Sequence, residues 1–271
     1  PLDSLISGSA KKLRTSERRE ISAGVWIAIG YVIGETLMAS GFPGFPPETL
    51  KFLRDLSRNN NREWFQAHKA IYEEKVKTPM IALVLFLGGA IQSFAPEMVV
   101  DPKRAIFRIY RDTRFSQDKS PYKTWVAAVF APRGIPKHRG AVLYFHISPE
   151  EVLIAGGIYM PLPAELRAIR RHIAVHWEEL SKITENRNFR KILGRLEGEQ
   201  LTRAPREFPE DHPAIDFLRY KQYLVSVTEP PKFAESPRLV PRMLTAFAAM
   251  MPLVRFLNEP LKASLPLAGP A

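Results

Sequence analysis

Basic side chains are concentrated in one stretch of the sequence, between Pro102 and Arg139. This stretch holds ten Lys and Arg residues and two acidic residues, in a chain whose formal net charge is +11. Guanidinium groups bind phosphate and carboxylate bidentately, and ammonium groups add a point charge. The stretch therefore predicts a site for an anionic partner. Its basic members are Lys103, Arg104, Arg108, Arg111, Arg114, Lys119, Lys123, Arg133, Lys137 and Arg139.

The densest part of this stretch reads RIYRDTRFSQDKSPYKT, over residues 108–124. We interpret 104–124 as a strand–loop–strand segment, in which Ser-Gln-Asp and Ser-Pro mark the loop. The loop would present cations and hydroxyl groups that could cradle a phosphate or carboxylate group, while the two aspartates orient the arginines. A glycine pair, Gly156-Gly157, in a neighbouring strand would let a ligand approach the backbone. The candidate ligand-binding residues are Arg108, Arg111, Asp112, Arg114, Asp118, Lys119, Tyr122, Lys123 and Gly157.

The same charges could stabilise the fold instead of binding a ligand. Arg111, Asp112, Arg114 and Asp118 could pair among themselves, and such a network would pin the loop to the sheet. An anionic small molecule and a nucleic-acid backbone are both partners that would suit an unpaired cluster. The sequence leaves ligand binding, nucleic-acid binding and a purely structural role open.

His146 is the best candidate for a catalytic general base. Its side chain shares a strand face with that of Tyr144, because side chains alternate along a strand. With the arginine cluster nearby, a histidine base would suit a hydrolase that acts on a phosphoester or acyl substrate. A single histidine in a strand is more often a hydrogen-bonded core residue than a catalyst, so the enzyme remains an alternative.

The motifs favour neither a metal site nor a cofactor. His172 and His176 are four residues apart on a predicted helix, with Glu179 nearby, but the HExxH pattern does not occur. The GxGxxG, GxxxxGK[ST] and GxSxG patterns do not occur either. The sequence contains no cysteine, which excludes disulfides, thiol nucleophiles and cysteine-ligated zinc. We therefore predict no metal site and no cofactor.

The hydrophobic pattern predicts a single α+β domain with an antiparallel sheet of about five strands, covered by N-terminal and C-terminal helices. A short loop at 148–151 indicates a hairpin. Asn60 and Glu63 have the spacing of a capping box, which would open a helix that Pro79 ends or kinks. The predicted strands are 105–111, 125–131, 141–147, 152–159 and 222–227. The other predicted helices are about 47–58, 80–94, 164–180, 189–196, 214–219 and 237–257.

Three parts of the chain differ in composition. Residues 1–37 form an N-terminal extension, which we interpret as a translated upstream stretch before Met38. Its apolar run, Ile21–Gly34, is too short to span a bilayer, although a signal-like segment over 21–39 would mean export. The domain occupies 38–260, and 261–271 is expected to be a disordered tail. This organisation favours a cytoplasmic protein that does not bind membranes.

The sequence resembles a bacterial and fungal family, the domain of unknown function 2461, from about Phe42 to Leu257. The resemblance implies a start near Met38, a shared fold and a set of candidate positions, and it implies no reaction. Residues 108–124 differ slightly from the expected form RIFRDTRFSKDKSPYKT. The matching stretches are FPGFPPETLKFL (42–53), NNNREWFQAHKAIYE (59–73), RIYRDTRFSQDKSPYKT (108–124), YFHIS (144–148), GGIYMP (156–161) and APREFPEDHPAIDFLRYKQYLV (204–225).

Overall fold

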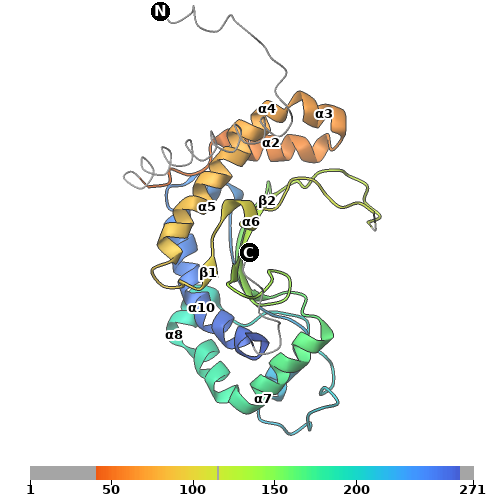
Figure 1. Cartoon of the computed structure of the whole chain (residues 1–271), viewed down its shortest axis with the longest axis vertical. Coiled ribbons are helices and arrows are strands. Elements are labelled where there is room, and N and C mark those ends of the chain that lie inside the picture. Colours follow the sequence, from red (N-terminus) through yellow and green to blue (C-terminus); the bar gives the residue numbers. More distant parts are fainter. Residues whose placement is uncertain (1–40, 115, 263–271) are drawn as a thin grey trace, which may run out of the picture. The chain divides into compact units, whose positions relative to one another are not determined.

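The computed structural model describes residues 41–114 and 116–262, and Figure 1 shows the arrangement of their helices and strands. The chain divides into two compact units, 1–41 and 42–271, and the second contains the elements described below. The predicted extension over 1–37 lies outside the described residues, as do positions 263–271 of the predicted tail.

The N-terminal helices follow the predicted pattern, with one correction. Helix α2 (Pro47–Arg58) begins at a proline, which suits the first helical turn because the nitrogen there needs no intrahelical partner. The helix predicted from Asn60 to Pro79 is instead divided into several shorter elements, and Pro79 lies in the first turn of the next helix, α5 (Thr78–Ile91). Six of the fourteen residues of α5 are buried, among them Leu83, Leu87 and Ile91. Between α2 and α5 lie α3 (Arg62–Ala67), α4 (Lys69–Ile71) and the π-helix η1 (Tyr72–Lys77).

Five antiparallel strands form one sheet in the order β1-β2-β3-β4-β5, which confirms the predicted α+β class. The short loop at 148–151 joins β3 to β4, and Ile147 pairs with Val152 across it, so the predicted hairpin is confirmed. The strands are β1 (Met98–Val99), β2 (Val126–Pro132), β3 (Val142–Ile147), β4 (Val152–Ile158) and β5 (Tyr223–Glu229).

The strand predicted over 105–111 was wrong. Asp101 caps a helical turn, α6 (Pro102–Ala105), and the residues after it form only isolated bridges. Ile106 pairs with Ala128 of β2, whereas Tyr110 pairs with Tyr122, so the segment leaves the sheet between these two positions. The β-branched and aromatic residues that suggested a strand therefore pair with two different segments, β2 and residue Tyr122.

The C-terminal helices cover one face of the sheet. The longest, α10, packs against β3, β4, α5, α7 and α8. Leu143, Phe145 and Ile147 of β3 are fully buried, whereas Tyr144 and His146 point to the other face and are partly exposed. The remaining elements are α7 (Pro163–Glu185), α8 (Arg187–Leu193), α9 (Ile215–Leu218), the 3-10 helix η2 (Pro231–Glu235) and α10 (Leu239–Lys262).

Within the described residues, α10 alone is long and apolar enough to cross a membrane. More than half of its most apolar window is buried inside the domain. A core helix of a globular domain meets the same criteria of length and composition, and the contacts of α10 with the sheet and with three other helices are those of a core helix.

Candidate functional site

The basic segment forms a two-stranded ribbon outside the sheet. The Arg111 amide donates to the Pro121 carbonyl at 2.9 Å, and the Lys123 amide donates to the Ile109 carbonyl at 2.8 Å. These bonds surround the Tyr110–Tyr122 bridge. The loop at 112–120 therefore closes the ribbon, and Figure 1 shows this segment extending beyond β2.

Asn60 holds the ribbon against the N-terminal helices. Its side-chain amide donates to the Tyr122 carbonyl at 2.9 Å and accepts from the Tyr122 amide at 3.0 Å. The capping box predicted at Asn60 was therefore wrong, because the side chain of Asn61 caps α3 through the Trp64 amide. The ring of Tyr122 stacks on that of Phe65 at 4.1 Å between centroids, which buries the tyrosine.

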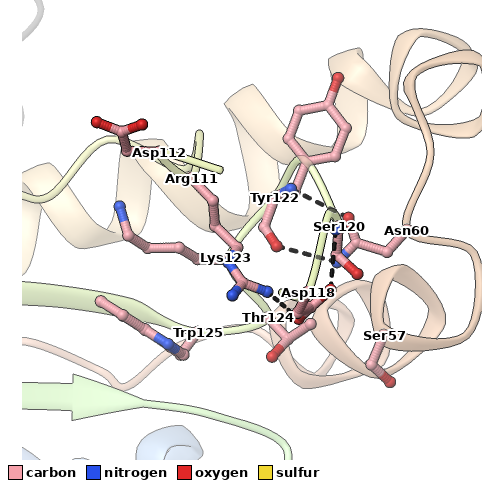
Figure 2. A pocket seen from close by; sticks show the side chains of 10 residues that line it. All are labelled: Ser57, Asn60, Arg111, Asp112, Asp118, Ser120, Tyr122, Lys123, Thr124 and Trp125. Carbon is pink, nitrogen blue, oxygen red and sulfur yellow. Dashed lines mark hydrogen bonds and ion pairs between the residues drawn. The ribbon is translucent and has the colours of Figure 1, made fainter. Parts of the chain in front are cut away.

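A cleft of about 540 Å³ lies beside this ribbon (Figure 2). It includes five of the predicted ligand-binding residues: Arg111, Asp112, Asp118, Tyr122 and Lys123. The other five were not predicted: Ser57, Asn60, Ser120, Thr124 and Trp125. Ser57 and Asn60 come from the end of α2 and the turn after it, so nothing in the basic segment itself could reveal them.

Two ion pairs within the segment neutralise part of its charge. Arg111 pairs with Asp118, and hydrogen bonding to Ser120, together with Arg111, holds the pKa of Asp118 well below its usual range. The Arg114 guanidinium binds Asp112 bidentately, at 3.0 and 2.7 Å, and lowers the pKa of this carboxyl to about 2. The four residues do pair among themselves, but their bonds close the ribbon loop on itself and do not join it to the sheet.

Lys123 is the exception among the cations of the cleft. Its ammonium donates to the carbonyls of Arg108 at 2.7 Å and Tyr110 at 3.1 Å, and these acceptors carry no formal charge. It lies 5.4 Å from the centre of the Trp125 ring. No carboxylate within the described ranges forms an ion pair with it. Burial lowers the pKa of Lys123, and the neighbouring charges of Arg108, Arg111 and Lys137 lower it further.

The other predicted binding residues lie outside the cleft lining. Arg108 is exposed, Arg114 is exposed and paired with Asp112, and the Lys119 ammonium donates to the Thr113 carbonyl at 3.0 Å. Gly157 lies on β4 with φ +121°, where any Cβ would collide with the Tyr223 carbonyl of β5. Close strand pairing therefore explains this glycine, and the structure does not bring it to the cleft.

His146 lies between two polar side chains on the open face of the sheet. Its Nδ1 is 3.2 Å from the Tyr144 hydroxyl, and its Nε2 is 3.3 Å from a carboxylate oxygen of Glu151. Burial lowers the pKa of His146, although Glu151 and Glu150 act in the opposite direction. Burial also raises the pKa of Tyr144 to about 12. The ring of Trp125, which lines the cleft, is 6.2 Å from the His146 ring.

The rings of His172 and His176 pack against each other on α7. Their rings are 4.6 Å apart, and the His172 ring also contacts Phe256 of α10 at 4.6 Å. Residues 41–114 and 116–262 contain no group of three or more His, Cys, Asp or Glu side chains that could hold a metal ion.

Comparison with known proteins gives a family but no named relative. No curated protein matches the chain. A family model described as "Conserved hypothetical protein (DUF2461)" matches residues 48–256, which is more than half of the chain. The match runs from α2 into α10, so it contains the ribbon, the cleft and His146. The chain therefore belongs to the DUF2461 family of conserved hypothetical proteins.

Proposed function

We propose that the cleft binds a small molecule through a phosphate or carboxylate group, with Lys123 as the principal cation. The observation that carries this proposal is the environment of the Lys123 ammonium. It is partly buried, it lies near other cations, and its hydrogen bonds go to two carbonyls and to no carboxylate within the described ranges. A bound anion would offset both the desolvation and the repulsion.

The remaining groups in the cleft suit this role. An ammonium group has three donors, and two are used by the carbonyls, so one remains for a ligand. Thr124 adds a hydroxyl group, which is a neutral donor, whereas the hydroxyl of Ser57 already donates to the Arg54 carbonyl at 2.7 Å and that of Ser120 bonds Asp118. A volume of about 540 Å³ lies in the range of small-molecule sites. Because Arg111 and Asp118 already pair, Arg111 leaves little net charge for a ligand, and Lys123 is the cation that remains in the cleft lining.

The test compares two single-charge variants of the ribbon. Lys123→Met removes the proposed anchor, whereas Lys119→Met removes an equal charge whose ammonium binds a loop carbonyl outside the cleft. The midpoint of thermal unfolding is measured with phosphate, phosphorylated metabolites and small carboxylates, and a compound that raises it is identified as a ligand. At a hundredfold excess over Kd, such a ligand stabilises the folded state by about 2.7 kcal/mol.

We expect Lys123→Met to abolish this stabilisation and Lys119→Met to retain it. Equal losses in both variants would mean that only the general positive field matters, and no stabilisation by any compound would overturn the proposal. Nucleic-acid binding is separated by its salt dependence, since the logarithm of its affinity falls by about 0.9 per neutralised duplex phosphate for each tenfold rise in salt.

A second candidate function rests on the hydrogen bonds of His146. We propose that Tyr144, His146 and Glu151 form a proton relay beside the cleft. A neutral His146 that donates from Nε2 to Glu151 leaves Nδ1 free to accept the Tyr144 hydroxyl proton. The relay would serve proton transfer to or from a substrate whose anionic group lies near Lys123, as in a hydrolase for phosphoester or acyl substrates. The Trp125 ring lies near both His146 and the Lys123 ammonium.

A further inference from the structure

A second cavity, of about 530 Å³, lies between the N-terminal part of α7 and the proline-containing loop at 201–208. Its walls include apolar side chains from both segments, among them Leu166, Leu201, Pro205 and Phe208. Four arginines complete the lining: Arg167, Arg170, Arg203 and Arg206. The only carboxylate in the lining belongs to Glu207. The cavity is thus both apolar and cationic, and it shares no lining residue with the cleft at Lys123.

The charges around this cavity are unbalanced. Glu207 pairs with Arg167 at 3.6 Å and with Arg171 at 3.3 Å, so one carboxylate serves two guanidinium groups. Neither Arg203 nor Arg206 forms an ion pair with a carboxylate in the described part of the chain. Their positive charges are therefore available to a ligand.

Arg170 provides the second, independent observation. One of its terminal nitrogens donates to the Tyr220 carbonyl at 2.9 Å, but its Nε is buried and has no hydrogen-bond partner in the structure. A buried donor without an acceptor costs free energy, and a guanidinium group without a counter-charge adds to that cost. An anion bound in the cavity, which Arg170 lines, would supply the counter-charge.

The apolar walls indicate what else the ligand carries. Inorganic phosphate would leave Leu166, Leu201 and Phe208 in contact with water, whereas an organic tail would cover them. Met160 and Leu162 flank the lining residue Pro161 in the sequence, and their side chains are 73% and 51% exposed, although neither lines the cavity itself. We propose that this cavity binds an amphipathic organic anion, whose carboxylate or phosphate group faces the arginines and whose apolar body fills the cavity.

The experiment measures binding to the full chain by isothermal titration calorimetry. The probes are octanoate and octyl phosphate, which share a tail and differ in the charged group. Acetate tests the charged group alone, and 1-octanol tests the tail alone. We expect both amphipathic anions to bind at least about tenfold more tightly than acetate or octanol, and the tighter of the two identifies the preferred charged group.

Three variants locate the binding. The double substitution Arg203→Met with Arg206→Met removes two exposed charges, and we expect it to weaken octanoate at least about tenfold. Arg195→Met removes an exposed arginine that does not line the cavity, and Lys123→Met alters only the first cleft, so both should bind octanoate as the parent does. Octanoate that binds the double variant unchanged, or no more tightly than acetate, would overturn the proposal. Loss of binding in Lys123→Met would do the same.

Discussion

Individual side chains in the basic segment have different roles although the sequence makes them look alike. Arg111 and Arg114 have an aspartate within seven residues along the chain, and each is neutralised by it. Asp118 is only five residues from Lys123 in the sequence, but it pairs with Arg111, and the Lys123 ammonium donates to main-chain carbonyls instead. The charge that is left for a ligand therefore depends on which cations the loop has already paired.

His146 gives a prediction for pH. Since burial lowers its pKa, the unfolded chain takes up a proton at about pH 6.5 that the folded protein still excludes. The contribution of His146 to stability is therefore present above that pH and is lost as the pH falls toward the lowered pKa. We expect urea unfolding between pH 5 and 8 to show this slope, and His146→Gln to reduce it.

The exposed His138 supplies the control for this measurement, because its ring is not buried. His138→Gln should keep the parent's pH dependence. If the two variants gave the same slope, His146 would not be the buried neutral base that the proton relay requires, and the second candidate function would be withdrawn.

At the scale of elements, the sequence predicts what is encoded locally and misses what is not. Prolines at helix starts, apolar periodicity and the short 148–151 loop predict α2, α5, α7, α10 and the β3–β4 hairpin. Asn60, in contrast, binds Tyr122 from 62 positions away, and no local pattern distinguishes it from the capping Asn61. The segment at 105–111 has strand-like residues, but its partners are divided between β2 and the ribbon.

The attachment of the ribbon can be tested through Asn60. Asn60→Ala removes two hydrogen bonds and leaves the amide and carbonyl of Tyr122 without these partners, so we expect a loss of about 1–3 kcal/mol in the free energy of unfolding. The amides of 109–111 and those of Tyr122 and Lys123 should also exchange faster with solvent, as measured by hydrogen exchange. Binding of the anion at Lys123 should weaken as well, because the ribbon positions its ammonium.

Asn61→Ala is the matched control, since it removes the cap of α3 at a cost of about 1 kcal/mol. It should leave exchange in the ribbon unchanged. A ribbon that exchanged no faster in Asn60→Ala than in Asn61→Ala would show that the stacking of Tyr122 on Phe65 holds it without the amide.

For the whole molecule, the sequence indicates the first of the two proposed cationic sites and gives no sign of the second. The first can be recognised in the sequence because its charged residues lie close together, between Pro102 and Arg139. The second combines Arg167 and Arg170 of α7 with Arg203 and Arg206 of a distant loop, and these two pairs are more than thirty residues apart in the sequence. Only the packing of that loop against α7 brings the four guanidinium groups to one cavity.

The contacts of α10 predict that the sheet and the helices packed against it unfold in one cooperative transition. This helix packs against the sheet on one side and against α5, α7 and α8 elsewhere, so each of them loses buried surface if α10 detaches. Phe247 lies at its centre, fully buried, with its ring 6.0 Å from that of Phe130 in β2.

We expect Phe247→Ala to lower the free energy of unfolding by about 3–5 kcal/mol and to retain a single transition. Thr245→Ala, at an exposed position of the same helix, should change it by less than about 0.5 kcal/mol. Far-ultraviolet circular dichroism reports the helices. Tryptophan fluorescence, measured in a background that carries Trp26→Phe and Trp177→Phe, reports Trp64 and Trp125, of which Trp125 lines the cleft. Coincident curves from the two would establish one cooperative unit, whereas a fluorescence change that precedes the loss of helix would show that the cleft unfolds separately from α10.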